Sequence, residues 1–432
     1  MPLFRSLAII LLFGFASSAA TAQLNAQGVT IIEAPSNFEF VDMGYDSTNN
    51  EVGIVGHIVN GADRTATVFE LNASQDGFTA QTLADLPGAT QRAAVRGISA
   101  DASRIAGASS STDSIDFEGT TWLRSDPNSP TGIGFTPNSP INNSLATGAW
   151  SGGVVGDSGG QNRPIIWDEA NGIQELLGTG ISIARAQDIS SDGQITVGFS
   201  SHEIVSGAAY FWDSTGINRL DDSIVDHTLI SSRARNISPN GNYIGGEISA
   251  LDINGNFKLY PVVWEGPART LRVLTDSNGD FIQGSVSDVS NMGITVGLIL
   301  DSNFDISGFI DNPEFTNGAE NFESWLETIS PGISSSFISL DVNSIATGNG
   351  ELFFAVNGSA GESVLVNVEI GSEPGEPGEP GDVNQDGKVN FLDISPFIQV
   401  LSSGEYQIEA DVNQSGEVNF LDISPFIQVL SS

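Results

Sequence analysis

The chain has no cysteine among its 432 residues, which excludes disulfide bonds and zinc sites built on thiolates. Basic residues are scarce too, since 15 lysines and arginines face 53 aspartates and glutamates and the net charge is −38. Without a basic patch to neutralise phosphate groups, nucleic acid is not an expected partner. So acidic a protein suits an extracellular medium that contains salt or calcium.

A long hydrophobic run is also missing, because no stretch reaches the roughly 20 apolar residues that a membrane-spanning helix needs. A short apolar run, AIILLFGF (8–15), follows Arg5 and precedes the small residues Ala20-Thr21-Ala22. A basic start, a short apolar core and a small-residue cleavage site are typical of a secretory signal peptide. Residues 1–22 are therefore predicted to direct secretion, and no membrane span is expected.

A degenerate repeat fills most of the chain between about residues 40 and 370. Each copy has a turn rich in small or Asp/Asn residues, apolar residues that end in glycine, a polar loop and a strand centred on an aromatic residue. The copies begin at NNEVGIVGHIV (49–59), GISADASRIAGASS (97–110), SGGVVGDSG (151–159), DISSDGQITVGFSS (188–201), NISPNGNYIGGEIS (236–249), DVSNMGITVGLIL (288–300) and, more loosely, DVNSIATGNGELFFAVNGS (341–359). The anchor glycines, spaced 42 to 52 residues apart, are Gly56, Gly107, Gly156, Gly198, Gly245 and Gly297.

A period of this length with short β-branched strands is typical of a β-propeller, in which each repeat forms one four-stranded blade. Asp192-Gly193 and Asn240-Gly241 indicate hairpins, because glycine accepts the positive φ of tight turns. A single blade cannot bury both faces, so neighbouring blades must cover each other around a ring. We therefore predict an all-β, seven-bladed β-propeller over residues 24–370, with six or eight blades left open. Residues 24–38 are expected to form only a lead-in.

Aromatic-centred strands are predicted at TTWLR (120–124), PIIWDE (164–169), AYFWDS (209–214), PVVWEG (261–266) and GFIDN (308–312). Four tryptophans stand at matching points of successive repeats and are expected to pack between blades rather than to bind a ligand: Trp122, Trp167, Trp212 and Trp264. The pattern of an Ile-Ser/Asn-x-Gly-x-x-Val-Gly turn followed by a Trp-Asp/Glu strand resembles the extracellular HAF repeats over most of residues 40–333. This resemblance implies secretion and no established activity.

Two nearly identical stretches stand near the C-terminus, DVNQDGKVNFLDISPFIQVL (382–401) and DVNQSGEVNFLDISPFIQVL (411–430). Each places oxygen-bearing groups at positions 1, 3, 5, 7, 9 and 12 of a loop, with glycine at position 6, which is the spacing that wraps six to eight oxygens around Ca²⁺. Two calcium sites are therefore predicted, the second weaker because a serine replaces a carboxylate. The predicted ligands, with Lys388 and Glu417 acting through their carbonyl groups, are Asp382, Asn384, Asp386, Lys388, Asn390, Asp393, Asp411, Asn413, Ser415, Glu417, Asn419 and Asp422.

One helix is predicted after each loop, since Phe391, Ile394, Phe397, Ile398 and Leu401 fall on one helical face. A calcium loop with a single exit helix, present twice over residues 382–432, resembles a type I dockerin. The resemblance implies calcium-dependent folding and docking onto a cohesin-like protein domain. Loop positions 10 and 11, which in that family usually carry small hydroxyl residues or alanine, hold the apolar pairs Phe391-Leu392 and Phe420-Leu421 here. We expect these pairs to be buried against the sister repeat.

The stretch GSEPGEPGEPG (371–381) separates the two regions and is predicted to be an extended, fairly stiff linker, because proline limits the backbone and the carboxylates repel each other. The expected organisation is thus a signal peptide (1–22), a propeller (24–370), a linker (371–381) and a small α-helical calcium-loop domain (382–432).

No catalytic residue and no organic cofactor is expected. The run GDSGG (156–160) matches the nucleophile signature of trypsin-like proteases, but repeat alignment places it in a blade loop, and the three histidines, His57, His202 and His227, show no pairing with metal-ligand spacing. Asp168, Asp213 and Glu265 recur after the blade tryptophans, which favours a structural role at strand ends.

Two functions fit the sequence, and a third makes the propeller a structural spacer. The first is a secreted, non-catalytic propeller that binds an extracellular polysaccharide or matrix ligand and is tethered by its calcium-dependent module. The alternative is a secreted carbohydrate-active enzyme, a glycoside hydrolase or polysaccharide lyase in polysaccharide catabolism, with carboxylates in the central funnel of the propeller.

Overall fold

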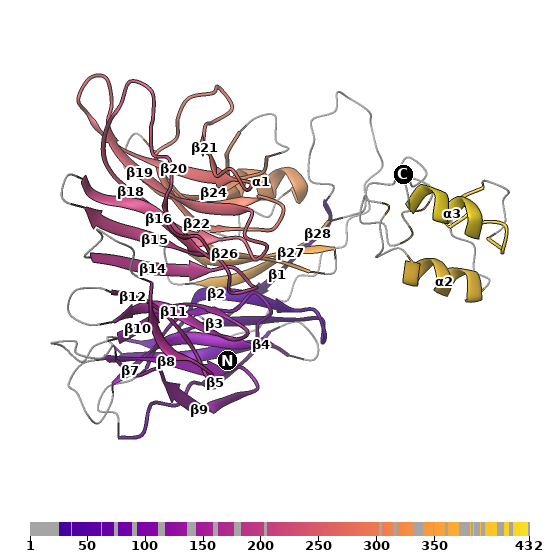
Figure 1. The fold of residues 1–432 in the computed structure, drawn as a ribbon, viewed down its shortest axis with the longest axis horizontal. Helices are drawn as coiled ribbons and strands as arrows, with labels where there is room; N and C mark the ends of the chain where they lie inside the picture. Colours follow the sequence, from indigo (N-terminus) through magenta and orange to yellow (C-terminus); the bar gives the residue numbers. More distant parts are fainter. Residues whose placement is uncertain are drawn as a thin grey trace. The chain divides into compact units, whose positions relative to one another are not determined.

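The computed structural model of the chain forms two compact units, which comprise residues 28–369 and 370–432 (Figure 1). It describes residues 26–370 except 36, 62, 73–76, 89–92, 111–116, 136–143, 159–162, 177–182, 203–204, 302–304, 314–317, 332–339, 349 and 359–361, and in the second unit residues 381, 383, 389, 394–403, 410–413 and 418–430. The predicted signal peptide and nearly all of the predicted linker lie outside the described residues. No helix in the described parts is long and apolar enough to cross a membrane.

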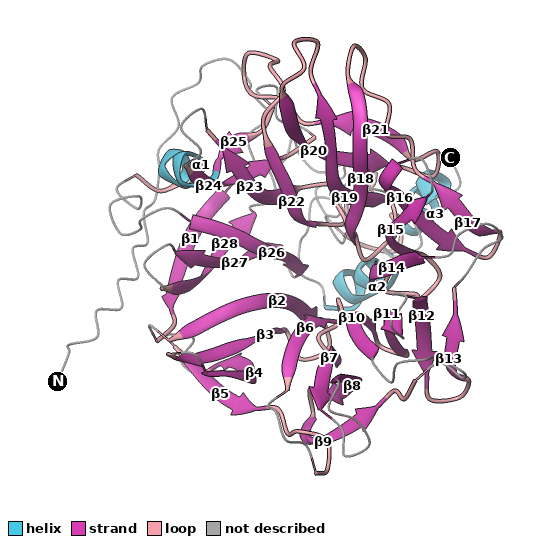
Figure 2. Cartoon of the chain, turned by 90° about the vertical axis from the view of Figure 1, so that its left-hand side faces the viewer, coloured by secondary structure: helices cyan, strands magenta, loops and turns pink. Residues whose placement is uncertain are grey.

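Seven antiparallel sheets of four strands each are arranged radially in the first unit, which confirms the seven-bladed propeller (Figure 2). Blade 1 contains β2 (Phe38–Asp46), β3 (Glu51–Asn60), β4 (Asp63–Leu71) and β5 (Phe78–Thr82). Blade 2 contains β6 (Ala94–Ile98), β7 (Arg104–Ser110), β8 (Phe117–Leu123) and β9 (Asp126–Gly132). Blade 3 contains β10 (Ser144–Trp150), β11 (Gly153–Ser158), β12 (Arg163–Asp168) and β13 (Gly172–Glu175), and blade 4 contains β14 (Ile183–Ile189), β15 (Thr196–His202), β16 (Val205–Asp213) and β17 (Gly216–Arg219).

The remaining blades complete the ring. Blade 5 contains β18 (Thr228–Ile237), β19 (Tyr243–Leu251), β20 (Phe257–Glu265) and β21 (Thr270–Val273). Blade 6 contains β22 (Gly284–Val289), β23 (Thr295–Leu300), β24 (Ile306–Asp311) and β25 (Glu320–Asn321), and it is followed by α1 (Phe322–Ile329). Blade 7 contains β26 (Leu340–Gly348), β27 (Glu351–Gly358) and β28 (Ser363–Ile370) together with β1 (Ala26–Glu33). The first strand of each blade lies nearest the centre and contacts the first strands of its neighbours, and β26 contacts β2 to close the circle.

The N-terminal strand β1 is the outermost strand of blade 7, so the prediction that residues 24–38 are only a lead-in was wrong. It lies beside β28, and the backbone N–H of Ala34 donates to the carbonyl oxygen of Ser363 at 2.8 Å. Ile32 is buried in the core that blade 7 shares with blade 1. The last blade is thus built from both ends of the propeller sequence, which ties the first blade to the last.

The anchor glycines lie opposite a β-bulge that interrupts the first strand of every blade. A Cβ atom at Gly156 would collide with the carbonyl oxygen of Leu145, and one at Gly198 with that of Arg185, so glycine is needed beside the bulge in these blades. In blade 5 the residue at this register position is Gly246, which corrects the predicted Gly245. The equivalent residue of blade 7 is Val356.

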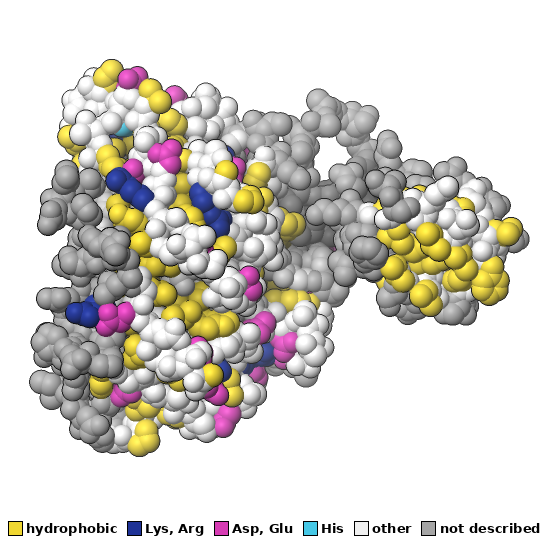
Figure 3. All heavy atoms as spheres, in the orientation of Figure 1, with side chains coloured by type: hydrophobic (Ala, Val, Ile, Leu, Met, Phe, Trp, Pro, Cys, Tyr) yellow, Lys and Arg dark blue, Asp and Glu magenta, His cyan; other side chains and the backbone are white. Residues whose placement is uncertain are grey.

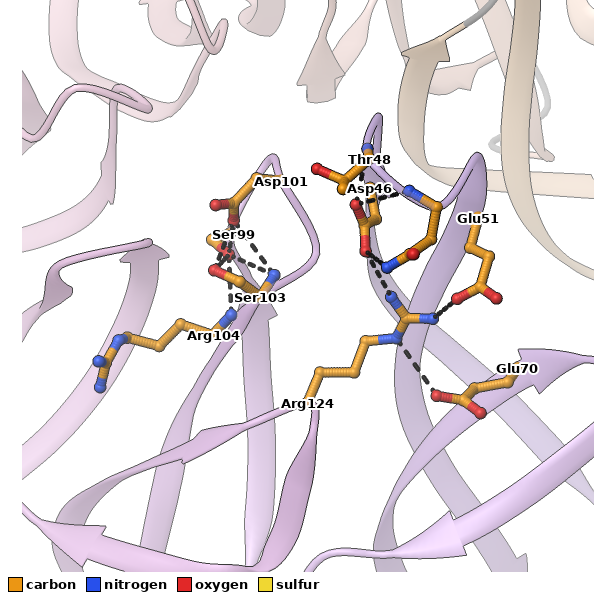
Figure 4. Close-up of polar contacts among 10 residues, drawn as sticks. Asp46, Thr48, Glu51, Glu70, Ser99, Asp101, Ser103, Arg104 and Arg124 are labelled. Atoms are coloured by element: carbon orange, nitrogen blue, oxygen red, sulfur yellow. Dashed lines mark hydrogen bonds and ion pairs between the residues drawn. The ribbon is translucent and has the colours of Figure 1, made fainter.

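The turn between the first and second strands explains the Ser-x-Asp/Asn signature of the repeat. In blade 2 the hydroxyl of Ser99 donates to Asp101 at 2.5 Å and accepts from the backbone N–H of Arg104 at 2.9 Å (Figure 4). Ser190 with Asp192 and Ser238 with Asn240 repeat the contact at 2.6 and 2.8 Å. Nearby, Arg124 of blade 2 reaches Glu51 and Glu70 of blade 1 at 2.8 and 3.3 Å, which links these blades (Figure 4).

The four repeat tryptophans occupy one register position on the third strand of blades 2 to 5, where they pair with Ile105, Val154, Thr196 and Ile244. All four are buried, and Trp122 and Trp264 are at most 1% exposed. Trp122 packs among residues of blades 1 and 2, and Trp264 among residues of blades 4 and 5. Trp167 packs with Ala106 of blade 2 as well as with residues of its own blade 3, so the prediction that the tryptophans pack between blades is confirmed for these three.

The second unit contains two short helices, α2 (Ile394–Ser403) and α3 (Ile423–Leu430), which correspond to the helices predicted after the two loops. Phe397 and Phe426 stack with their ring centres 4.0 Å apart and an interplanar angle of 3°. With Val383 and Ala410 they form the small core of this unit. Because the two phenylalanines are equivalent residues of the two repeats, each repeat covers the core residue of the other.

Candidate functional site

The second predicted calcium loop is partly described, and it places two carboxylates in the interior of the C-terminal unit. Asp411, at loop position 1, is 3% exposed, and Asp422, at position 12, is fully buried. Asn413 and Asn419 are also described. The other predicted ligands lie outside the described residues: Asp382, Asn384, Asp386, Lys388, Asn390, Asp393, Ser415 and Glu417.

The carboxylate of Asp422 closes the loop on itself. One of its oxygens accepts a hydrogen bond from the backbone N–H of Asn413 at 3.1 Å, and the other accepts from that of Asn419 at 2.9 Å. The carbonyl oxygen of Asp422 also accepts from the N–H of Phe426, so the same residue begins α3. Residues at both ends of the predicted loop are thereby held around one buried carboxylate.

The charge balance of this unit fits a bound cation. Lys388 is the only lysine, arginine or histidine between residues 371 and 432, so two buried carboxylates have no second basic side chain in the unit to neutralise them. Burying a carboxylate without a counter-charge is costly. In the described part of the chain no three acidic or histidine side chains converge on one point. Ca²⁺, which takes carboxylate, amide and carbonyl oxygens together, suits such a donor set.

Apolar side chains are exposed on the C-terminal unit (Figure 3). Phe420 is 82% exposed and Leu421 is 72% exposed, so the expectation that this pair is buried against the sister repeat was wrong. Ile398 and Ile427, equivalent residues of the two helices, are each 58% exposed, whereas Phe397 next to Ile398 is buried. The buried position of each helix goes to the phenylalanine that stacks with its partner. The first pair, Phe391-Leu392, lies outside the described residues.

A second candidate site, which the sequence analysis did not identify, is a cavity of about 380 Å³ along the centre of the propeller. The seven bulge residues, one from the first strand of each blade, all line it: Val41, Arg96, Thr147, Gln187, Arg235, Ser287 and Asn343. A bulge leaves one residue without a partner across the ladder, and here that residue lines the central channel.

The residue after the bulge is an aspartate in blades 1, 4 and 6, and each of these carboxylates joins its blade to the next. Asp42 accepts from the backbone N–H of Ile98 in blade 2, Asp188 from that of Ile237 in blade 5, and Asp288 from that of Ile345 in blade 7, all at 2.9 Å. Each also accepts from the N–H of its own successor. All three line the channel.

These carboxyl groups hold their protons unusually firmly. Burial raises the pKa of Asp42 to about 6 and that of Asp188 to about 7, and hydrogen bonds oppose the rise only in part. Burial, together with repulsion from Asp42, raises the pKa of Asp288 to about 8. The hydroxyl of Ser344 lies 2.8 Å from an oxygen of Asp42 and 2.8 Å from an oxygen of Asp288. A hydroxyl carries one hydrogen, so the second contact needs a proton on a carboxyl group.

The sequence motifs considered for catalysis have structural explanations. Residues 156–158 of the GDSGG run belong to strand β11 and not to the predicted loop, and Ser158 is 1% exposed. Asp168 and Asp213 accept hydrogen bonds from backbone N–H groups of the turns that follow them, and Glu265 pairs with Arg272 at 2.5 Å. Asp157 differs, because it lines the channel and burial raises its pKa to about 7 despite the nearby Arg185.

The pattern that could have pointed to the channel is the Asp or Asn just before the Ile/Val-Ser turn, as in Asp188-Ile189-Ser190 and Asp288-Val289-Ser290. This pattern marks the repeats, but the sequence alone gives no role to its carboxylate. The bulge residues differ in kind from blade to blade, so no repeat pattern identifies them.

Comparison with known proteins gives a family match for the C-terminal part of the chain. Residues 380–431 match the Dockerin type I domain family. No curated protein matches the chain. Among solved structures, the chain is similar to TolB from Acinetobacter baumannii, with 17% identity, a TM-score of 0.33 and coverage of 54% of this chain and 56% of that one. It is also similar to the β-propeller domain of the Trilobed protease from Pyrococcus furiosus, with 10% identity, a TM-score of 0.44 and coverage of 77% and 93%.

Dockerin domains generally bind Ca²⁺ and cohesin domains and are typically extracellular. The seven sheets, which include β1, and the matched C-terminal region account for nearly all the described residues. The chain is therefore a seven-bladed β-propeller followed by a type I dockerin domain.

Proposed function

We propose that this protein is a secreted, non-catalytic β-propeller that binds an extracellular ligand and is tethered through calcium-dependent docking of its dockerin domain onto a cohesin-like partner. The match of residues 380–431 to the dockerin family carries the proposal. It is supported by the burial of the carboxylates of Asp411 and Asp422, whose charge a bound cation would neutralise. It is also supported by the predicted signal peptide at residues 1–22. Two Ca²⁺ ions are proposed, one for each of the loops beginning at Asp382 and Asp411.

The docking surface in this proposal is apolar. Phe420 and Leu421 stand exposed at loop positions where hydroxyl residues or alanine are usual in type I dockerins, so the partner should offer an apolar surface in place of hydrogen-bonding groups. Burying a Leu or Phe side chain contributes about 1.5–3 kcal/mol. A pair of them can therefore supply a substantial part of the affinity and decide which cohesin-like domain is bound.

Replacing both apolar pairs, Phe391-Leu392 and Phe420-Leu421, by serine in the full-length chain is expected to weaken docking at least about 100-fold, because about 3 kcal/mol or more of apolar burial is lost. Surface plasmon resonance against a panel of cohesin domains, with and without a calcium chelator, measures the effect. Both pairs are changed because the duplicated sequence offers the same contact twice.

The matched control is Leu123→Ser, which removes an exposed apolar side chain of the propeller, 43% exposed, and should leave docking unchanged. Docking that survives the serine variant, or that persists equally well in chelator, would contradict the proposed calcium-dependent apolar contact.

One observation favours the alternative of a carbohydrate-active enzyme. Asp42, Asp157, Asp188 and Asp288 line one channel, and their raised pKa values resemble those of a general acid. All four, however, accept backbone hydrogen bonds that fasten one blade to the next, which gives them a structural role. Asp157 differs from the other three because it also lies 3.8 Å from the guanidinium group of Arg185.

We expect the purified full-length protein to release no product from a panel of neutral and acidic polysaccharides, as measured by reducing-end and unsaturated-product assays. The decisive variant is Asp157→Asn, which keeps the size of the side chain and removes its acid. Turnover by the parent protein that disappears in this variant would establish the enzyme and overturn the non-catalytic proposal.

A further inference from the structure

The central channel concentrates positive charge in a strongly acidic protein. Of the 15 lysines and arginines in the chain, Arg96, Arg185 and Arg235 line this one cavity. They come from blades 2, 4 and 5. With a net charge of −38, a cluster of arginines is not expected by chance placement, and keeping it at the centre of the ring indicates a use for positive charge there.

One of these guanidinium groups lacks an ion-pair partner among the described residues, and a second has only a long ion pair. Arg235 is bound to Glu247 through two hydrogen bonds of 2.9 and 2.7 Å, so its charge is neutralised. Arg185 is 47% exposed, and its ion pair with Asp157 is long, with 3.8 Å between its Nε atom and the carboxylate oxygen. Arg96 has no ion-pair partner in the part of the chain that the structure describes. The wall of the cavity on blades 2 to 4 thus carries charge that the protein itself does not fully balance.

The acidic groups of the channel cancel this charge only in part: Asp157 lies 3.8 Å from Arg185, and burial raises the pKa of Asp157 to about 7. The carboxyl oxygens of Asp42, Asp188 and Asp288 accept hydrogen bonds from backbone N–H groups of the neighbouring blades. Burial raises the pKa of each carboxyl group toward or above neutrality. At neutral pH a large share of them is uncharged. The channel therefore combines arginine side chains with hydrogen-bonded carboxyl groups that are only partly ionised at neutral pH.

Unused polar groups also line the cavity. Asn236 is 6% exposed, and neither its amide nitrogen nor its amide oxygen has a hydrogen-bond partner among the described residues. Leaving a buried amide unsatisfied costs about 1–3 kcal/mol, so a ligand or water that bonds to it is favoured. Ser287 adds a hydroxyl group on the same ring, and Thr147, Gln187 and Asn343 add polar groups that each already donate one hydrogen bond to a backbone carbonyl oxygen.

We propose that the central channel is a binding site for a small hydroxyl-bearing carboxylic acid, whose carboxylate lies between Arg96 and Arg185 and whose hydroxyl groups meet the amides and hydroxyls of the bulge ring. The arginines supply charge-assisted hydrogen bonds of the kind that recognise carboxylates. A cavity of about 380 Å³ admits a molecule of this size but not a folded protein segment. The inference deepens the proposed binding role of the propeller by naming the chemistry of its ligand.

Isothermal titration calorimetry of the full-length, calcium-loaded protein with gluconate tests the proposal, with glucitol as the uncharged counterpart. Neither compound is a strong chelator that would strip calcium from the dockerin domain. Gluconate is expected to bind with millimolar or tighter affinity and glucitol at least about tenfold more weakly, the loss that follows from removing one charge-assisted hydrogen bond.

Arg96→Gln and Arg185→Gln should each lower the affinity for gluconate by about tenfold or more. Arg96→Lys should have an intermediate effect, because lysine keeps the positive charge but cannot donate two parallel hydrogen bonds to a carboxylate as a guanidinium group does. Arg163→Gln is the matched control, since Arg163 pairs with Glu175 in blade 3 and does not line the cavity. Tryptophan fluorescence melting verifies that each variant is folded.

Equal affinity for gluconate and glucitol, undetectable binding of gluconate, or unchanged affinity in both glutamine variants would overturn the proposal. The variant Asp411→Ala separates this test from that of tethering. It alters only the dockerin domain and should bind gluconate as the parent does, so that loss of docking and loss of channel binding are distinguishable.

Discussion

Replacing Asp422 by alanine is expected to reduce the number of bound calcium ions from two to one and to melt the helices of the dockerin domain at a much lower temperature. Native mass spectrometry counts the ions, and far-UV circular dichroism during a calcium titration follows α2 and α3. The full-length chain serves for both, because all six tryptophans lie in the propeller and their fluorescence reports separately that the propeller is intact.

The expected loss is large for two reasons. Calcium present at a thousandfold excess over its Kd stabilises the folded state by about 4 kcal/mol, and that term disappears with the site. The alanine also leaves the backbone N–H groups of Asn413 and Asn419 without the carboxylate that accepts from them. Because Phe397 and Phe426 stack across the repeats, disorder in the second loop removes the cover of the first helix as well.

Two substitutions separate metal binding from loop closure. Asp422→Asn keeps one hydrogen-bond acceptor but removes the negative charge, so it should bind calcium poorly while disturbing the apo domain less than alanine does. Ser415→Asp restores the carboxylate that the first loop has at the same position, Asp386, and should tighten the second site. Two ions still bound to Asp422→Ala, or no change of helicity on adding calcium to the parent, would refute the assignment of the loop.

The architecture of the propeller could be predicted from sequence because its repeat has a steric cause. In blades 1 to 6 a glycine lies where the second strand passes the bulge of the first, because a Cβ atom there would collide with the first strand, and Gly56, Gly107, Gly156, Gly198 and Gly297 mark five of these blades. The same physics explains the one displaced anchor. Gly245 and Gly246 are adjacent, and only the pairing of Gly246 with Ala234 shows which of them faces the bulge.

The closing strand could not be predicted, because β1 belongs to a blade whose other strands lie more than 300 residues further along the chain. Its sequence, AQGVTIIE, carries no anchor of its own, and its place is fixed by contacts with β28 such as that between Ala34 and Ser363. The channel was missed for a related reason. Its lining combines one residue from each of seven repeats, and these residues share a position but no chemical type.

The stability of the propeller is expected to fall as pH rises from about 4 to about 8. Asp42, Asp188 and Asp288 have pKa values raised by burial from 3.8 to about 6, 7 and 8. Between the unfolded and folded values the native state holds more protons than the unfolded state, so the free energy of unfolding decreases with increasing pH. The stabilisation is complete below pH 4 and is lost progressively through the folded pKa values.

The variant that tests this is Asp288→Asn, which cannot release a proton. It should flatten the pH dependence and exceed the parent in stability at the alkaline end by roughly 2 kcal/mol, a value reduced from the full linkage because the channel is open to water. Urea unfolding followed by tryptophan fluorescence at a series of pH values gives the free energies. The control Asp168→Asn should behave oppositely, because hydrogen bonds from Asn171 lower the pKa of Asp168 and its contribution grows as pH rises.

The contact of Ser344 with both Asp42 and Asp288 makes the prediction specific to the seam between blades 6, 7 and 1. A proton on Asp288 can be donated to the hydroxyl of Ser344, whose own hydrogen is then donated to Asp42, and this chain of two hydrogen bonds breaks when Asp288 ionises. Ser344→Ala should therefore cost most at acidic pH and little at alkaline pH. A cost that is the same at both ends, or a parent stability that rises from pH 4 to pH 8, would show that no proton is held at this seam.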